Sequence, residues 1–170
     1  MTLFLLVLLA ALAFEYINGF HDTANAMATP IATGALKPKL AVGIAAIMNL
    51  VGAFLSTTVA KTISVDMINP GVNITAQLVF AGLTGAILWN LTTWFLGLPS
   101  SSSHALFGGL IGSTMAYFGA AGVNFTKMIE KVFIPALFAP LVAGLVAFTA
   151  TKVAYWVTAR SQAERKAKDI

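Results

Sequence analysis

The chain lacks cysteine and has few charged residues. None of its 170 residues is a cysteine, which excludes disulfide bonds and thiolate metal sites. Only 9% of the residues are Asp, Glu, Lys or Arg, against about a quarter in ordinary soluble domains, whereas 58% are hydrophobic. This composition excludes a soluble globular domain and indicates a protein embedded in a lipid bilayer.

Long apolar runs account for most of the sequence. The four tracts are Leu3 to Ile17, Leu40 to Ala60, Ala76 to Leu98 and Val132 to Val157. The last three reach the roughly 20 residues that cross a hydrocarbon core, and we expect the first to continue as a helix toward Ile31, where Pro30 and Gly34 mark its end. We therefore predict an all-α protein of several membrane helices, with residues 1–159 as the membrane domain and residues 160–170 as a charged cytoplasmic tail.

The net charge of +4 does not indicate a nucleic-acid partner, because the basic residues are not gathered on one face together with aromatic residues. Six of them lie in the first connection and in the tail: Lys37, Lys39, Arg160, Arg165, Lys166 and Lys168. Loops rich in Lys and Arg stay in the cytoplasm, so we expect both segments inside and the start of the chain outside.

The third apolar tract is followed by an arm that is short for a membrane span. Gly97, Leu98 and Pro99 predict that a helix stops in a left-handed residue, and four serines, Ser100 to Ser103, follow. The next apolar segment, His104 to Phe118, has about 15 residues, fewer than a full crossing needs. We predict a re-entrant hairpin with the serines at a tip that reaches membrane depth; two full spans are the alternative.

Five polar residues form one stripe within the first predicted helix. Glu15, Asn18, Asp22, Asn25 and Thr29 are spaced by three and four residues, which places them on one helical face. A carboxylate at the centre of a membrane costs at least about 2.5 kcal/mol, and residues kept there at that cost usually mark a solute pathway.

The serine run predicts an anion site. Hydroxyl groups, the free N–H groups of a first helical turn and the positive end of the helix dipole together suit an anion without any lysine or arginine. The candidate residues are Ser100, Ser101, Ser102 and Ser103. The alternative is that one serine caps the helix and the others are linker.

Asp22 by itself would repel an anion at the serines, unless a cation or proton neutralises it. The combination therefore indicates symport. Asn25, one turn further, and Thr23 offer oxygen atoms suited to a hard cation, and His21 could carry a proton near neutral pH. Glu15 belongs either to this site or to the aqueous end of the helix. Asn90 and the two neighbouring tryptophans, Trp89 and Trp94, are interpreted as packing and interface residues.

Two motifs together carry a family resemblance. The segment Gly19-Phe20-His21-Asp22-Thr23-Ala24-Asn25-Ala26, followed by Gly97-Leu98-Pro99-Ser100-Ser101-Ser102-Ser103-His104, resembles the inorganic phosphate transporter (PiT) family, and its bacterial low-affinity branch most closely. The resemblance implies secondary transport of inorganic phosphate, driven by protons or sodium, in a bacterial-type plasma membrane and through a fold of two inverted repeats. It implies no cofactor, and it places Asp22, Asn25 and Ser100 to Ser103 in the substrate and ion site.

The chain departs from the family pattern in three respects. It has His21 where the commoner motif has asparagine, and Asn49 where sodium-coupled eukaryotic members have glutamate, which favours protons as the coupling ion. It also carries the aspartate motif once, so it resembles an N-terminal half that pairs with a complementary half or with a second copy. The excess of basic residues predicted inside argues against a second copy in the opposite orientation.

Other functions remain open. The same architecture could carry another oxyanion such as sulfate, or the chain could be a membrane subunit that transports nothing by itself. An intramembrane serine hydrolase is disfavoured because the glycine-flanked turn that exposes a nucleophilic serine is absent. We therefore expect no enzyme activity.

Overall fold

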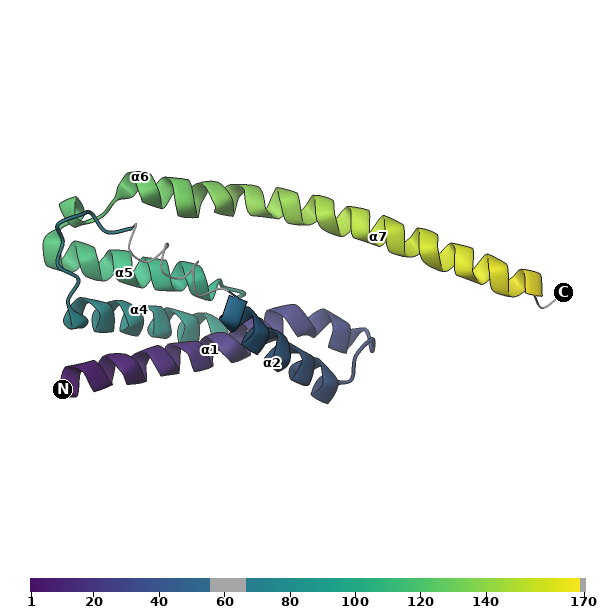
Figure 1. The fold of residues 1–170 in the computed structure, drawn as a ribbon, viewed down its shortest axis with the longest axis horizontal. Coiled ribbons are helices and arrows are strands. Elements are labelled where there is room, and N and C mark those ends of the chain that lie inside the picture. Colours follow the sequence, from purple (N-terminus) through teal and green to yellow (C-terminus); the bar gives the residue numbers. More distant parts are fainter. Residues whose placement is uncertain (56–66, 169–170) are drawn as a thin grey trace. The chain divides into compact units, whose positions relative to one another are not determined.

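The structure is a computed structural model that describes residues 1–55 and 67–168, and within these ranges it is helical. The helices are α1 (Thr2–Ala32), α2 (Pro38–Leu55), α4 (Ala76–Phe95), α5 (Ser102–Phe118), α6 (Phe125–Met128) and α7 (Ile134–Lys168) (Figure 1). A 3₁₀ turn lies at Ala120–Gly122 and a π-helical turn at Ile129–Phe133. Two compact units divide at Lys127, and they are described separately. The predicted all-α class is confirmed.

α1 is a single helix of 31 residues that includes the whole polar stripe, as the sequence predicted. Three helical segments of the described chain are long and apolar enough to cross a membrane: Thr2–Ala32, Ala76–Phe95 and Phe125–Arg160. Gly34, with a φ of +73°, lies in the turn after α1, a conformation that glycine adopts without strain. The second predicted span is helical over Pro38–Leu55, and its remaining residues, 56–60, lie outside the described residues.

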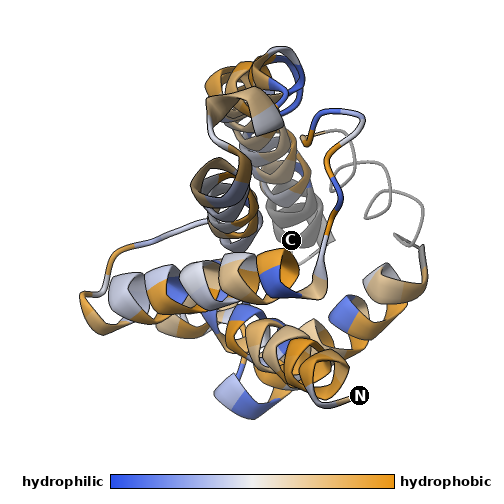
Figure 2. Cartoon of the chain, turned by 90° about the vertical axis from the view of Figure 1, so that its left-hand side faces the viewer, coloured by the Kyte–Doolittle hydropathy of each residue, from blue (hydrophilic) through white to orange (hydrophobic). Residues whose placement is uncertain are grey.

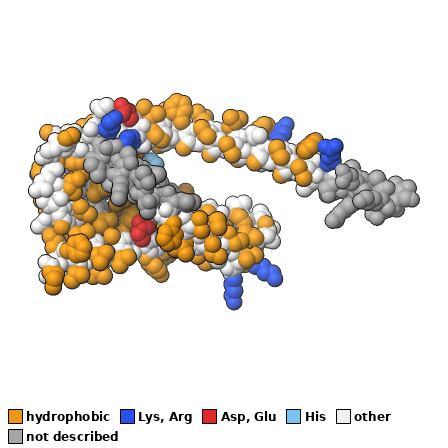
Figure 3. All heavy atoms as spheres, in the orientation of Figure 1, with side chains coloured by type: hydrophobic (Ala, Val, Ile, Leu, Met, Phe, Trp, Pro, Cys, Tyr) orange, Lys and Arg blue, Asp and Glu red, His pale blue; other side chains and the backbone are white. Residues whose placement is uncertain are grey.

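Hydrophobic residues make up most of these helices (Figure 2), and hydrophobic side chains cover much of the face that Figure 3 shows. On α1, for example, Leu9 and Leu12 are about 60% exposed, and Phe4 is 70% exposed. Soluble monomers rarely present apolar surface of this extent to water, whereas a surface facing lipid requires it. The exposed apolar faces therefore belong against the bilayer.

α4 and α5 form an antiparallel hairpin, and α1 lies along α4 in the same direction (Figure 1). The hairpin turns as predicted, because Gly97 has a φ of +65° and Pro99 follows. Behind the turn, the core is built from Phe14 of α1, Leu83 and Ala86 of α4, and Ala105 of α5. This core fixes the position of the serine tip against α1.

Close packing within the hairpin depends on two glycines. A Cβ atom at Gly109 would collide with the carbonyl oxygen of Gly82, and one at Gly82 would lie 2.9 Å from Leu110 Cδ2. Gly108 and Gly112, in contrast, have no atom within 4 Å of such a Cβ position and line an open groove. Of the glycines at 108, 109 and 112 in α5, Gly109 therefore makes the close contact with α4.

The matched pair Gly109→Ala and Gly112→Ala tests this packing. Gly109→Ala should lower the free energy of unfolding by about 1–3 kcal/mol, since a methyl group is forced against backbone. Gly112→Ala should leave it equal or raise it by up to about 1 kcal/mol, because alanine has the higher helix propensity. Chemical unfolding of the two variants in the same detergent measures the difference. Equal effects would contradict the assigned contact.

The open end of the hairpin is closed by two irregular segments. Asn69 Nδ2 donates to the carbonyl oxygens of Ala121 at 2.8 Å and Val123 at 3.2 Å, and Ile68 forms an isolated bridge with Val123. Asn69, Pro70 and Gly71 form a turn, in which Gly71 has a φ of +103° and the Val72 N–H donates to the Asn69 carbonyl oxygen at 3.2 Å.

The second unit consists mainly of α7, a helix of 35 residues with Pro140 in its interior. The helix does not end at residue 159 but continues through Lys168, because the charged residues beyond Arg160 are good helix formers. The boundary predicted there is therefore a change in composition and not in secondary structure. A cytoplasmic location for residues 160–170 stays a prediction.

Candidate functional site

The tip of the hairpin meets the polar stripe at one hydrogen bond. Ser102 Oγ donates to Asp22 Oδ1 at 3.2 Å, across 80 residues of sequence, and Ser102 is 2% exposed. Asp22 is twenty residues from Thr2 and ten from Ala32, which is about 30 Å and 15 Å along α1. Since a hydrocarbon core is about 30 Å thick, this contact lies within the membrane if α1 crosses it. The re-entrant hairpin stays a prediction, because α4 is long and apolar enough to cross a membrane by itself.

The other serines have different surroundings. Ser101 is the N-cap of α5 and accepts a hydrogen bond from the His104 backbone N–H at 3.4 Å. Ser100 Oγ accepts from Trp89 Nε1 at 3.1 Å, and Ser103 is exposed. The capping alternative thus applies to Ser101, while Ser102 makes the contact with the stripe.

The first turn of α5 favours an anion electrostatically. α5 has 17 residues, so its N-terminal N–H groups carry the positive end of a helix dipole. No Asp, Glu, Lys or Arg occurs between residues 76 and 118. An anion at the tip would therefore be held by N–H and hydroxyl groups. The charged residue in contact with the tip is Asp22, through its hydrogen bond from Ser102.

Not all predicted site residues gather at the tip. Thr23 donates its hydroxyl to the Gly19 carbonyl oxygen within α1, and with Glu15 and Asn49 it lines a groove of about 720 Å³ between α1 and α2. Asn25 lies one turn beyond Asp22 on the exposed side of α1. The structure thus brings Asp22 to Ser102, while Glu15 and Thr23 face the neighbouring groove.

His21 belongs to the packed face of α1. It is 4% exposed and follows Phe14 and Ile17 at helical spacing on the buried side. Its Nδ1 atom has no hydrogen-bond partner among the described residues. The packing of His21 therefore leaves one ring nitrogen without a hydrogen bond. A buried polar atom without a partner is costly.

Asn90, interpreted from the sequence as a packing and interface residue, has an unsatisfied side chain. This residue of α4 is 0% exposed, and neither Oδ1 nor Nδ2 of its side chain has a partner in the described part of the chain. The Oδ1 atom of Asn18, in the predicted stripe, is likewise buried and unpartnered. The available signal was the position of Asn90 seven residues after Leu83, which puts an amide on the buried face of an apolar helix.

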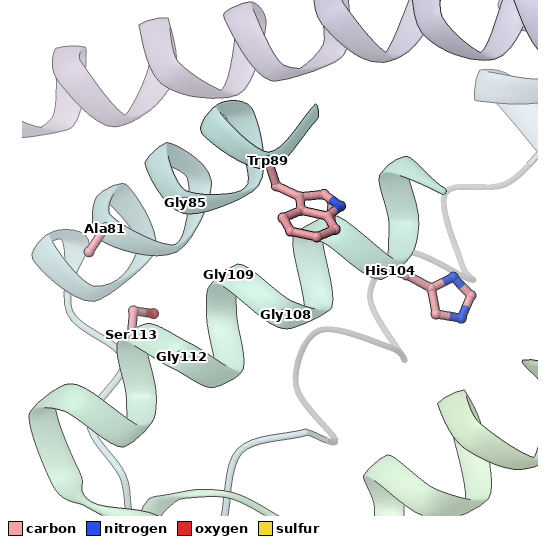
Figure 4. A pocket seen from close by; sticks show the side chains of 9 residues that line it. Ala81, Gly85, Trp89, His104, Gly108, Gly109, Gly112 and Ser113 are labelled. Atoms are coloured by element: carbon pink, nitrogen blue, oxygen red, sulfur yellow. The ribbon is translucent and has the colours of Figure 1, made fainter. Parts of the chain in front are cut away.

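His104, in the first turns of α5, is exposed. With Trp89, Gly108 and Gly112 it lines an open groove of about 570 Å³ along α4 and α5 (Figure 4). The His104 Nδ1 atom is 2.8 Å from Ser101 Oγ, the N-cap oxygen. This pair lies at the helix end, and we assign it to capping.

The long apolar helices, with their exposed hydrophobic side chains, define an integral membrane protein. Residues 18–170 match the Phosphate transporter family, and the chain belongs to this family. It is 56% identical over 156 residues to a probable low-affinity inorganic phosphate transporter of Mycobacterium leprae, covering 92% of this chain and 37% of that protein. A Streptomyces halstedii protein with the same description is 45% identical over 157 residues, covering 92% of this chain and 73% of its own length.

A solved structure described as the sodium-dependent phosphate transporter has the same fold. Its TM-score is 0.81 at 25% identity, over 90% of this chain and 39% of that chain. The chain thus spans less than two fifths of this neighbour and of the M. leprae protein. The recognised family and the membrane location are confirmed.

Proposed function

We propose that the chain forms the phosphate-translocating part of a secondary transporter that works by cation symport. The single observation that carries this proposal is the hydrogen bond from Ser102 at the hairpin tip to Asp22 of α1. It joins an element suited to an anion to a carboxylate suited to a cation or proton. In this proposal Asn25 and Ser100 to Ser103 bind phosphate.

In this proposal the coupling ion neutralises the charge of Asp22. His21, Thr23 and Glu15 are further candidates for coupling. We favour the proton over sodium because an imidazole, His21, stands beside the polar stripe and because Asn49 supplies no carboxylate. The structural neighbour is named for sodium, so both ions enter the test. Glu15 and Thr23 would act from the α1–α2 groove and not from the tip.

The coupling ion is tested in proteoliposomes that contain the transporter purified from its own cells with any further subunit. An inward proton gradient without sodium should drive the accumulation of radiolabelled phosphate, and a protonophore should abolish it. Accumulation that depends on sodium and ignores the protonophore would contradict proton coupling while leaving phosphate symport intact.

The rest of the transporter is proposed to be a complementary half. The chain matches 37% of the M. leprae protein, and the family resemblance implies two inverted repeats. A second copy of the chain and a subunit without transport are the alternatives, and uptake by the chain expressed alone distinguishes them. Sulfate is the rival substrate, and unlabelled sulfate in excess should leave phosphate uptake unchanged.

A further inference from the structure

α1 and α4 carry buried polar atoms without partners in the described structure, and the three residues that hold these atoms are called here the interhelical polar cluster: Asn18, His21 and Asn90. The unpartnered atoms are Asn18 Oδ1, His21 Nδ1, and both Oδ1 and Nδ2 of Asn90. Asn90 is 0% exposed and His21 is 4% exposed. Buried polar groups almost always have a hydrogen-bond partner, so several exceptions in one region call for a cause.

The packing register brings these residues to one level. Phe14 of α1 and Leu83 of α4 belong to the same core cluster, and the two helices run in the same direction (Figure 1). His21 lies seven residues after Phe14, and Asn90 lies seven residues after Leu83. Seven residues are about two helical turns, so each residue is on the same face as the one it follows. The Phe20 and Trp94 rings, 5.4 Å apart between centroids, show that the two helices are also in contact near these residues.

The same register places Asn90 level with the first turn of α5. Ala86 and Ala105 share the core cluster, and α5 runs opposite to α4. One helical turn closer to the tip, Asn90 follows Ala86 on α4, and Ser101 and Ser102 precede Ala105 on α5. A buried, unpartnered carboxamide thus lies beside a helix N-terminus, where N–H groups and the helix dipole favour an anion.

We infer that Asn90 is a further substrate-binding residue, whose carboxamide donates to phosphate when the hairpin tip moves away from α1. This inference rests on the proposed function and extends the site from the serine tip to α4. In the described structure the Asn90 side chain is 0% exposed, so an anion reaches it only after the packing around it opens. The side-chain hydrogen bond from Ser102 to Asp22 is the contact that tip movement would break.

The variant Asn90→Leu separates a binding role from a structural one. Leucine has nearly the same shape as asparagine and leaves no buried polar group unpartnered, so the unfolding temperature of the purified protein should stay equal or rise. Uptake of radiolabelled inorganic phosphate, in cells that carry the gene in its own chromosomal setting, should show an apparent affinity about tenfold weaker, the effect of losing one hydrogen bond.

Thr114→Val is the matched control, because Thr114 is also 0% exposed but donates its hydroxyl to the Leu110 carbonyl oxygen of its own helix. It should leave uptake unchanged. Wild-type uptake with unimpaired uptake by Asn90→Leu would overturn the inference alone, whereas absent wild-type uptake would overturn the proposed function and the inference with it. If Asn90→Leu does not reach the membrane, Asn90→Ala is assayed instead and judged by the same uptake criterion.

Discussion

Asp22→Asn should reduce phosphate uptake about 100-fold or more, which corresponds to roughly 3 kcal/mol or the loss of one strong interaction with a charged group. The amide keeps an oxygen that can accept the hydrogen bond from Ser102, so the hairpin tip should stay in place. It cannot take up a proton, and it carries no charge to attract a cation. The variant therefore removes coupling while it preserves the packing.

Radiolabelled uptake together with the unfolding temperature measures this effect. The expected result is an unfolding temperature close to that of the wild type and uptake near background. Uptake at the wild-type level in a folded Asp22→Asn protein would contradict the assigned role of the carboxylate. A large fall in the unfolding temperature would instead indicate that Asp22 acts through stability.

Ser102→Ala should reduce uptake about 10- to 100-fold, since it deletes the hydroxyl that donates to a carboxylate. The matched control is Ser113→Ala in the same helix. Ser113 is 8% exposed, and its hydroxyl donates to the Leu110 carbonyl oxygen within α5. Both variants remove one buried hydroxyl from α5, but only Ser102 reaches another helix through it.

The control should transport phosphate like the wild type, and both variants should be present in the membrane in equal amounts. Equal losses of uptake in the two variants would point to a general effect on α5. No loss in either variant would remove Ser102 from the site.

The helical class and the ends of α1 and α4 followed from the sequence, whereas α7 continues to Lys168, beyond the apolar tract that ends at Val157. Gly97 and Pro99 predicted the end of α4, and the left-handed conformation of Gly97 bears this out. The helical spacing of the stripe from Glu15 to Thr29 predicted α1 correctly. These signals are local, because backbone sterics and helical periodicity act over a few residues.

The partners of the polar side chains could not be predicted in the same way. The sequence did not distinguish which of Ser100 to Ser103 would contact α1. The packing of α5 against α1 places Ser102 in contact with Asp22. Asn90 was assigned to packing because its neighbours are aromatic, whereas its burial depends on the register of three helices. Such long-range pairings follow from tertiary packing and leave no periodic mark in the sequence.

The most direct test of the central claim is protection of the hairpin tip by phosphate. The chain has no cysteine, so Ser103→Cys provides a single thiol at the tip. Its rate of modification by a charged, membrane-impermeant thiol reagent is measured with and without phosphate. At a phosphate concentration ten times the dissociation constant, the rate should fall about tenfold, because about one site in ten stays empty. Sulfate at the same concentration should leave the rate unchanged. A modification rate that phosphate does not alter would contradict a phosphate site at the serine tip.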